Sequence, residues 1–287
     1  MIKELARFAT GLMPQEVRAR IARYRFGYSG AGRAIPLSRA PGPPGCFEVR
    51  LGAGPRFMLT DDLAQDFATH FTEPGDCAAE MAAFLAASLA SGPSSCFIDV
   101  GSNRGLFSLL HLAAGDTHRA VLVDPSGLLC GQAAALLRLN GVLGRAEILT
   151  AGAAETGSTR RIVTDALGYA RVAGGQKGHD VPFLSIDELC AGRGLSPAMV
   201  KIDVEGAEAD VLRGAVQTLH AHRPLLFLEL HFDMLEQVGE RVGDLLGSLV
   251  VLGYRFETTR GVPLPRWQLQ RSLMAVQRVV ARPGPVR

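Results

Sequence analysis

Apolar residues from position 76 onward alternate between a helical period and short unbroken runs. The spacing of Met81, Phe84, Leu85 and Leu89 predicts a helix from Asp76 to Leu89. Short apolar runs come after it, of the kind that forms buried parallel strands. We expect strands at 96–100, 120–123, 146–149, 199–202 and 225–228, helices at 106–112, 128–139 and 207–219, and an antiparallel pair of strands at 254–257 and 273–276.

The regular alternation of strands and helices predicts an α/β fold with a parallel sheet and right-handed crossovers. In such open sheets, ligands bind beyond the carboxyl ends of the strands. Residues 28–60 are rich in glycine and proline, which separates a variable leader from the remainder of the chain. We therefore expect a partly helical N-terminal leader or cap over residues 1–75 and a Rossmann-like domain over residues 76–287.

Composition narrows the class of protein. The formal net charge of +2 gives no reason to expect a nucleic-acid partner. The five cysteines are scattered and include no C-x-x-C pair, so neither a disulfide framework nor a zinc site is expected, and a cytoplasmic location fits best. No apolar stretch reaches the roughly 20 residues of a membrane-spanning helix. The basic, amphipathic N-terminus is interpreted as a surface helix, with weak contact to a membrane surface as the alternative. Nothing in the sequence indicates an oligomeric state.

The turn after the first predicted parallel strand favours a ligand. Asp99 lies at the end of that strand, and Gly101 and Gly105 flank Ser102 and Asn103. The glycines let the backbone approach a ligand closely, and the following helix points its N-terminus at a negative group such as a methionine carboxylate. The dinucleotide fingerprint G-x-G-x-x-G is absent, because asparagine and leucine replace its second and third glycines. A purely structural turn is the alternative at this point.

The second predicted strand ends at Asp124, and Pro125 comes next. A carboxylate there can accept both hydrogen bonds of a ribose diol, as an adenosine-containing cofactor requires. After the third strand, the small residues of 150–154, among them Ala153, offer a surface against which an adenine ring can lie. We expect Asp124, Pro125 and Ala153 to contact the cofactor.

Several ordered motifs together resemble the FkbM-type methyltransferases. The resemblance covers roughly residues 95–260 and differs from the family in two places. Asp124 stands where the family often has glutamate, and Arg104 is bulkier than the residue often found there, with a solvent-facing position expected for it. The matching motifs are FIDVGSNRG at 97–105, VDP at 123–125, LN at 139–140, SIDEL at 185–189, KIDVEGAE at 201–208 and FLELH at 227–231.

The resemblance implies a seven-stranded class I methyltransferase fold and O-methylation of a hydroxyl with S-adenosylmethionine as donor. An alcohol is a poor nucleophile at neutral pH and benefits from a base, for which His231 and Asp203 are the first candidates. Glu229 is a further candidate, and Lys201 is expected to reach a neighbouring carboxylate or an acceptor oxygen. Asp203 is also expected to contact the cofactor. Asp203, Glu205, Glu229 and His231 also offer the ligand types that suit a hard divalent ion.

Other functions share parts of this pattern. A nicotinamide-dependent oxidoreductase would use the same sheet and Asp124, but the glycine spacing argues against it. A binding module that keeps the fold without catalysis is the other alternative. The acceptor is expected to be a small molecule or a glycan, such as a sugar or secondary metabolite hydroxyl, and the sequence does not specify which one.

Overall fold

The computed structural model describes residues 37–42, 44–51, 54–64, 76–172, 177–265, 269 and 276–285. The helix expected at the start of the leader lies outside these residues, and the boundary near residue 75 stays a prediction. Among the described residues, no helix is both long enough and apolar enough to cross a membrane.

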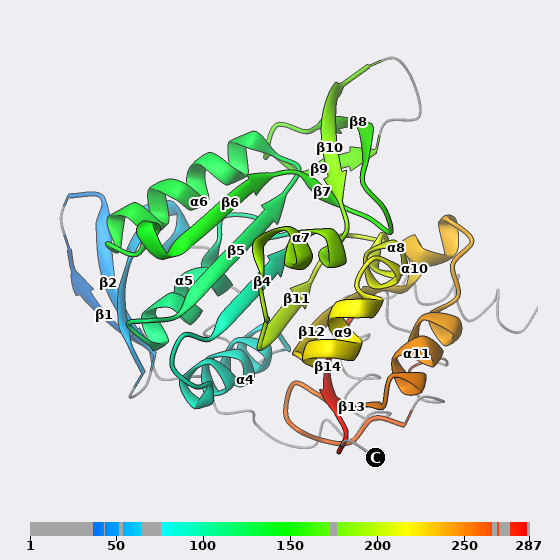
Figure 1. Ribbon diagram of the computed structural model, residues 1–287. Coiled ribbons are helices and arrows are strands. Elements are labelled where there is room, and N and C mark those ends of the chain that lie inside the picture. Colours follow the sequence, from blue (N-terminus) through cyan, green and yellow to red (C-terminus); the bar gives the residue numbers. More distant parts are fainter. Residues whose placement is uncertain are drawn as a thin grey trace, which may run out of the picture.

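A seven-stranded, mostly parallel sheet forms the centre of the fold (Figure 1). Five neighbouring strands run parallel, and the C-terminal strand inserts antiparallel between the parallel set and the strand at the edge. This arrangement confirms the expected fold class. In order across the sheet the strands are β13 (Tyr254–Thr258), β14 (Val276–Pro283), β12 (Leu225–His231), β11 (Met199–Ile202), β4 (Cys96–Val100), β5 (Arg119–Asp124) and β6 (Ala146–Thr150).

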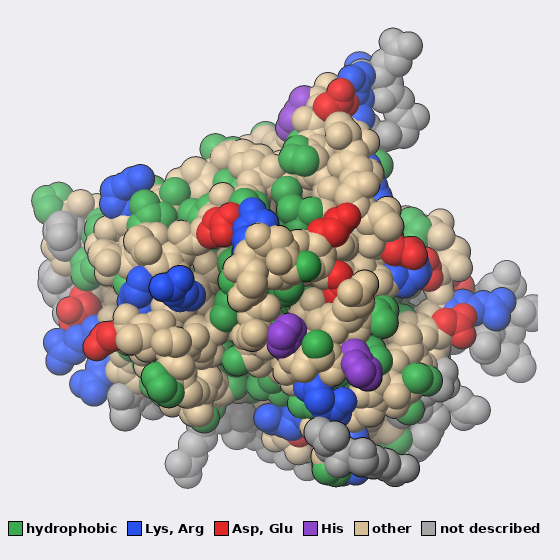
Figure 2. Space-filling view, in the orientation of Figure 1, with side chains coloured by type: hydrophobic (Ala, Val, Ile, Leu, Met, Phe, Trp, Pro, Cys, Tyr) green, Lys and Arg blue, Asp and Glu red, His purple; other side chains and the backbone are tan. Residues whose placement is uncertain are grey.

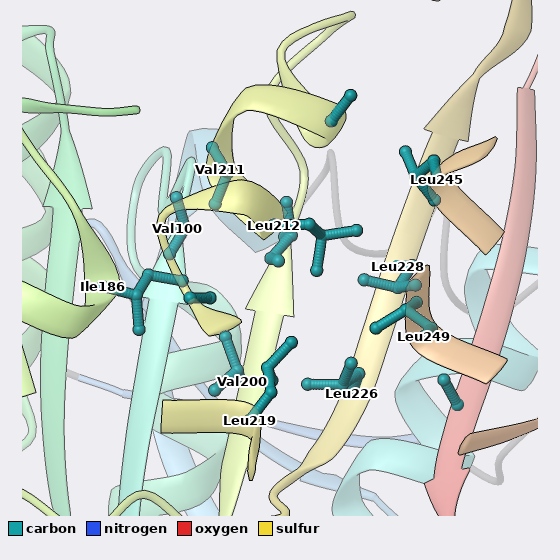
Figure 3. Close-up of a cluster of buried hydrophobic side chains, with 14 of the residues drawn as sticks. Val100, Ile186, Val200, Val211, Leu212, Leu219, Leu226, Leu228, Leu245 and Leu249 are labelled. Carbon is teal, nitrogen blue, oxygen red and sulfur yellow. The ribbon is translucent and has the colours of Figure 1, made fainter. Parts of the chain in front are cut away.

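Helices cover both faces of this sheet. One face packs against a cluster that includes side chains of three helices, α4 (Asp76–Ala90), α5 (Leu106–Ala114) and α6 (Gly127–Leu139). The other face packs against a second cluster, drawn in Figure 3, in which Val200 and Leu226 of the sheet meet helical side chains such as Leu212 and Leu249. The helices on this side are α7 (Ile186–Arg193), α8 (Glu208–Arg213), α9 (Val216–His222), α10 (Phe232–Gln237) and α11 (Val242–Val251).

Strand alternation decides which face carries the polar residues. Phe97, Met199 and Phe227 belong to the cluster on the α4–α5 face. Because successive side chains of a strand point to opposite faces, the residues two positions further on also point to the α4–α5 face. These are Asp99, Lys201 and Glu229, and they are buried. Chemistry-bearing side chains from three adjacent strands are thereby collected under α4 and α5.

Most predicted elements are found within three residues of their expected bounds, but three expectations need correction. The single helix expected at 207–219 is two helices, α8 and α9, which are separated at Gly214. A Cβ at Gly214 would lie 2.2 Å from the carbonyl oxygen of Ala154, so the chain is in close contact with its neighbour there. Strand β12 runs on to His231, so Glu229 lies within the strand instead of coming after it. The last strand was expected at 273–276, but β14 runs from Val276 to Pro283, and residues 273–275 lie outside the described part of the chain.

Two smaller sheets were missed by the sequence analysis. The first sheet is antiparallel, and its strand at Arg56–Thr60 is joined to the end of α6 by the side-chain amide of Asn140. Asn140 Oδ1 accepts the N–H of Met58 at 2.6 Å, and Asn140 Nδ2 donates to the carbonyl oxygen of Met58 at 2.9 Å. The second projects from the main body (Figure 1), and charged side chains gather near its end (Figure 2). Two of its strands are joined by the Arg161–Asp180 ion pair. The strands are β1 (Leu37–Pro41), β2 (Cys46–Leu51) and β3 (Arg56–Thr60) in the first sheet, and β7 (Gly152–Ala153), β8 (Ser158–Thr164), β9 (Ala170–Val172) and β10 (His179–Leu184) in the second.

Candidate active site

The glycine turn between β4 and α5 is held against two neighbouring strands. Gly101 has φ 76° and donates its N–H to the carbonyl oxygen of Val123 at 2.9 Å. A Cβ on Gly101 would lie 1.8 Å from the carbonyl oxygen of Asp203, so only glycine fits. Asn103 has φ 50°, which asparagine tolerates better than most residues, and Gly105 begins α5 with φ 75°. The turn therefore needs these residue types for its shape.

Replacing Gly101 with alanine is expected to destabilise the fold by at least about 3 kcal/mol, because the added methyl group meets the Asp203 backbone in addition to the strain of a positive φ. Gly141 provides the matched control. It has φ 68° but open space around a Cβ, so Gly141→Ala should cost only about 1–2 kcal/mol. Urea denaturation of both variants measures the difference, and equal losses would contradict the proposed clash.

Asp124 connects the glycine turn to the end of β5. Its Oδ2 accepts the backbone N–H of Asn103 and its Oδ1 that of Ser126, both at 2.9 Å. A carboxylate offers about four lone-pair positions, so two remain for a ligand. Burial raises the pKa of Asp124, although the two backbone hydrogen bonds favour its charged form.

The other residues expected to contact the cofactor differ in their surroundings. Ser102 is buried, and its Oγ has no hydrogen-bond partner among the described residues. Pro125, directly after β5, is half-buried. Ala153 lies in β7 and belongs to the hydrophobic cluster shown in part in Figure 3. The contact between Ala153 and an adenine ring stays a prediction.

Arg104 contacts the N-terminal part of the chain. Its Nη1 lies 3.1 Å from Oδ2 of Asp62, just after the end of β3. The sequence analysis expected a solvent-facing side chain, and a quarter of the Arg104 side chain is exposed. The ion pair links the glycine turn to the end of the first small sheet.

Lys201 reaches a carboxylate, as expected, and the carboxylate is that of Asp203. Its Nζ donates to Oδ2 of Asp203 at 2.7 Å and lies 4.8 Å from the ring centroid of Phe107. Burial lowers the pKa of Lys201, but the surrounding carboxylates, Asp203 and Glu80 foremost, outweigh burial and raise it overall. Lys201 is therefore a fixed positive charge that holds Asp203 in place.

His231 is fixed by an acidic residue that the sequence analysis did not single out. Its Nδ1 lies 2.6 Å from Oε1 of Glu208, whose side chain is fully buried at the start of α8. The other ring nitrogen, Nε2, lies 4.0 Å from Oδ1 of Asp203 and 3.9 Å from Oε1 of Glu229. With Nδ1 bonded to a carboxylate, Nε2 is the nitrogen that faces these two side chains.

Among the described residues around His231, negative groups outnumber permanent positive charges. Burial, assisted by Asp203, raises the pKa of Glu229 to about 7. Burial also raises the pKa of Asp99 to about 6, although Lys201 and a 2.7 Å hydrogen bond from Ser108 oppose the shift. Such shifts arise where carboxyl groups are desolvated and near one another. An added positive charge at this place would be favoured. The carboxyl groups are those of Glu80, Asp99, Asp203, Glu208 and Glu229, and the cations are Lys201 and Arg278.

Three of the four residues considered as metal ligands lie together. Asp203, Glu229 and His231 each offer one ligand atom, and these atoms all lie within 4.8 Å of one another. We call these three residues the carboxylate–histidine cluster. The fourth candidate, Glu205, is exposed and has φ 49°. Glu205 is not part of the cluster.

Arg278 and Glu80 were also missed. Arg278 of β14 donates from Nη2 to Oε1 of Glu229 at 2.6 Å and from Nε to Oε2 of Glu80 at 3.0 Å. No motif marks Arg278, which lies in the C-terminal tail, and Glu80 occurs within an ordinary helical pattern. For Glu208 a signal was present, because it ends the KIDVEGAE motif at the start of a helix.

The strand order, the antiparallel C-terminal strand and the glycine turn after β4 define a Rossmann-like class I methyltransferase fold. A comparison with protein families matches residues 99–256, more than half of the chain, to the Methyltransferase FkbM domain. The chain belongs to this family. It contains a methyltransferase domain.

Solved structures with similar folds include an FkbM methyltransferase from Methylobacillus flagellatus KT, with 15% identity and a TM-score of 0.44 over 68% of this chain and 45% of that one. The chain thus spans less than half the length of that protein. An S-adenosylmethionine-dependent methyltransferase from Agrobacterium tumefaciens has 12% identity and a TM-score of 0.45 over 96% and 80% of the two chains. A comparison with curated proteins finds no match.

Proposed function

We propose that the protein is an O-methyltransferase that acts on a hydroxyl group of a sugar, glycan or secondary metabolite. The observation that carries this proposal is the His231–Glu208 pair, which leaves Nε2 facing Asp203 and Glu229. This arrangement offers a proton acceptor with negative groups around it, which transfer to an alcohol needs. The cytoplasmic location expected from the sequence is part of the proposal, and none of the five cysteines, all of them among the described residues, forms a disulfide.

The donor side is formed by the glycine turn and Asp124. Gly101 and Gly105 give the backbone the shape for close approach, and the buried Oγ of Ser102, which has no partner in the described part of the chain, provides a hydrogen-bonding group. Asp124 keeps lone pairs for a ribose diol and fixes the N–H of Asn103. These features fit S-adenosylmethionine, as does the excess of carboxyl groups beside the turn, because a sulfonium is positively charged.

The acceptor side is formed by the carboxylate–histidine cluster. Glu208 fixes the ring of His231, so Nε2 would accept the proton of an acceptor hydroxyl as its oxygen attacks a methyl group presented from the donor side. Asp203 and Glu229 stabilise the imidazolium that results. When bound, S-adenosylmethionine would supply the activated methyl group on a positively charged sulfur, which would keep the electrons of the broken carbon–sulfur bond. Burial lowers the pKa of His231, but Glu208, Asp203 and Glu229 outweigh burial and raise it, and the sulfonium charge would oppose that rise.

Purified protein incubated with S-adenosylmethionine and a panel of acceptors tests the proposal. The panel contains sugars, glycans and hydroxylated secondary metabolites together with matched amines and thiols. We expect S-adenosylhomocysteine to form with a hydroxylated acceptor and NMR to place the new methyl group on oxygen. Cofactor binding without transfer to any acceptor would favour a binding module, and transfer to nitrogen or sulfur would refute O-methylation.

A metal-assisted reaction is the second candidate, and the close approach of the ligand atoms in the carboxylate–histidine cluster favours it. Against it, Asp203 and Glu229 already bind Lys201 and Arg278. We therefore expect that dialysis against EDTA leaves the transfer rate within about twofold and that added Mg²⁺ or Mn²⁺ changes it no further. If EDTA removed the activity and Mg²⁺ or Mn²⁺ restored it, a metal at these three residues would instead be established. The Glu205→Gln variant should then behave like the unaltered protein in both steps.

A further inference from the structure

Arg278 lies directly opposite Glu229 in the sheet. Strands β12 and β14 are antiparallel neighbours, and their register pairs these two residues. Side chains of paired residues in adjacent strands point to the same face, so the guanidinium of Arg278 reaches Glu229 on the α4–α5 face. The short Nη2–Oε1 distance of 2.6 Å is typical of a charge-assisted hydrogen bond.

Glu80 holds the other side of the same guanidinium. It lies on α4 and is 2% exposed, so its carboxylate depends on a partner inside the protein. That partner is Nε of Arg278. The helix itself is held in place by Phe84, whose ring makes edge contacts with Phe97 and Phe227 at centroid distances of 4.8 and 5.2 Å. Two nitrogens of the Arg278 guanidinium are thus fixed by two carboxylates, that of Glu229 in β12 and that of Glu80 in α4.

The consequence concerns the position of Glu229. The oxygen that accepts Arg278 is Oε1, and Oε1 is also the atom 3.9 Å from Nε2 of His231. Any rotation of the guanidinium therefore changes the position of a carboxylate oxygen beside His231. Without Glu80, Arg278 would be free to turn and make two hydrogen bonds to Glu229, which would draw Oε1 away from His231.

We propose that Arg278 and Glu80 are positioning residues that hold the Glu229 carboxylate against His231 during methyl transfer. The proposal rests on the proposed function for its kinetic consequence. Neither residue contacts the glycine turn or Asp124 through any of its observed ion pairs, so cofactor binding should not depend on them. The C-terminal strand and α4 thereby contribute to the acceptor side of a site whose motifs lie elsewhere in the sequence.

Arg278→Lys is the main test, because lysine keeps the charge among the buried carboxylates but cannot reproduce the fixed two-way geometry of a guanidinium. We expect kcat to fall about tenfold or more while the Kd for S-adenosylmethionine stays within about twofold. Glu80→Gln should have a smaller effect in the same direction. Arg282→Lys is the matched control, since Arg282 lies on the same strand and pairs with Glu257 at the surface. It should leave kcat unchanged.

A double-mutant cycle separates positioning from general destabilisation. In a Glu229→Gln background, Arg278→Lys should lower kcat by no more than about twofold, because the residue it positions has already lost its charge. An undiminished tenfold effect in that background would overturn the proposal. A crystal structure of Glu80→Gln provides a readout that does not need activity: Glu229 Oε1 should move away from His231 Nε2, and an unchanged position would also overturn it. Absence of hydroxyl methylation by the unaltered protein would instead refute the proposed function alone.

Discussion

Replacing Asp124 with alanine is expected to abolish measurable binding of S-adenosylmethionine. The carboxylate is proposed to accept two hydrogen bonds from the ribose diol, and hydrogen bonds to a charged group contribute about 1.5–3 kcal/mol each. It also fixes the N–H groups of Asn103 and Ser126, so its removal loosens the turn that contacts the donor. The combined loss corresponds to a fall in affinity of at least about 100-fold.

Isothermal titration calorimetry measures this effect. Asp116→Ala is a suitable control, because Asp116 is exposed and lies before β5, at the opposite end of the strand from Asp124. Its affinity should match that of the unaltered protein. If Asp124→Ala bound S-adenosylmethionine within threefold of the unaltered protein while remaining folded by circular dichroism, the assignment of Asp124 to the ribose would be wrong.

Replacing His231 with alanine is expected to slow methyl transfer by about 10²–10⁴-fold, the usual contribution of a general base. The Kd for S-adenosylmethionine should change little, because the ring contacts Glu208 and faces Asp203 and Glu229, whereas the donor side is formed by the glycine turn. Single-turnover kinetics with saturating cofactor measures the chemical step separately from binding.

His220→Ala serves as the comparison, since His220 is exposed on α9. Its transfer rate should equal that of the unaltered protein. An equal loss of cofactor affinity in His231→Ala and Asp124→Ala would refute the division into a donor side and an acceptor side.

The parts of the fold that depend on local pattern were predictable. The strand from Cys96 to Val100 and that from Met199 to Ile202 were expected at their observed bounds, because a short apolar run between turn residues specifies a buried strand. The three strands within residues 37–60 were missed, because glycine and proline clusters dominate the local pattern there. Phe57 and Leu59 are buried by residues that are distant in the sequence, so the local pattern does not show their burial.

The sequence by itself determined the succession of the main-sheet strands along the chain, the glycine turn, Asp124 and the motif that carries Lys201 and Asp203, since each depends on residues close together in the chain. Only the tertiary structure decided which charges meet. Arg278 reaches Glu229 through the register of β14 against β12, and Glu80 reaches Arg278 through the packing of α4. Strand register and helix packing are set by contacts between residues far apart in sequence, 198 positions apart for Glu80 and Arg278, so no local pattern reveals them.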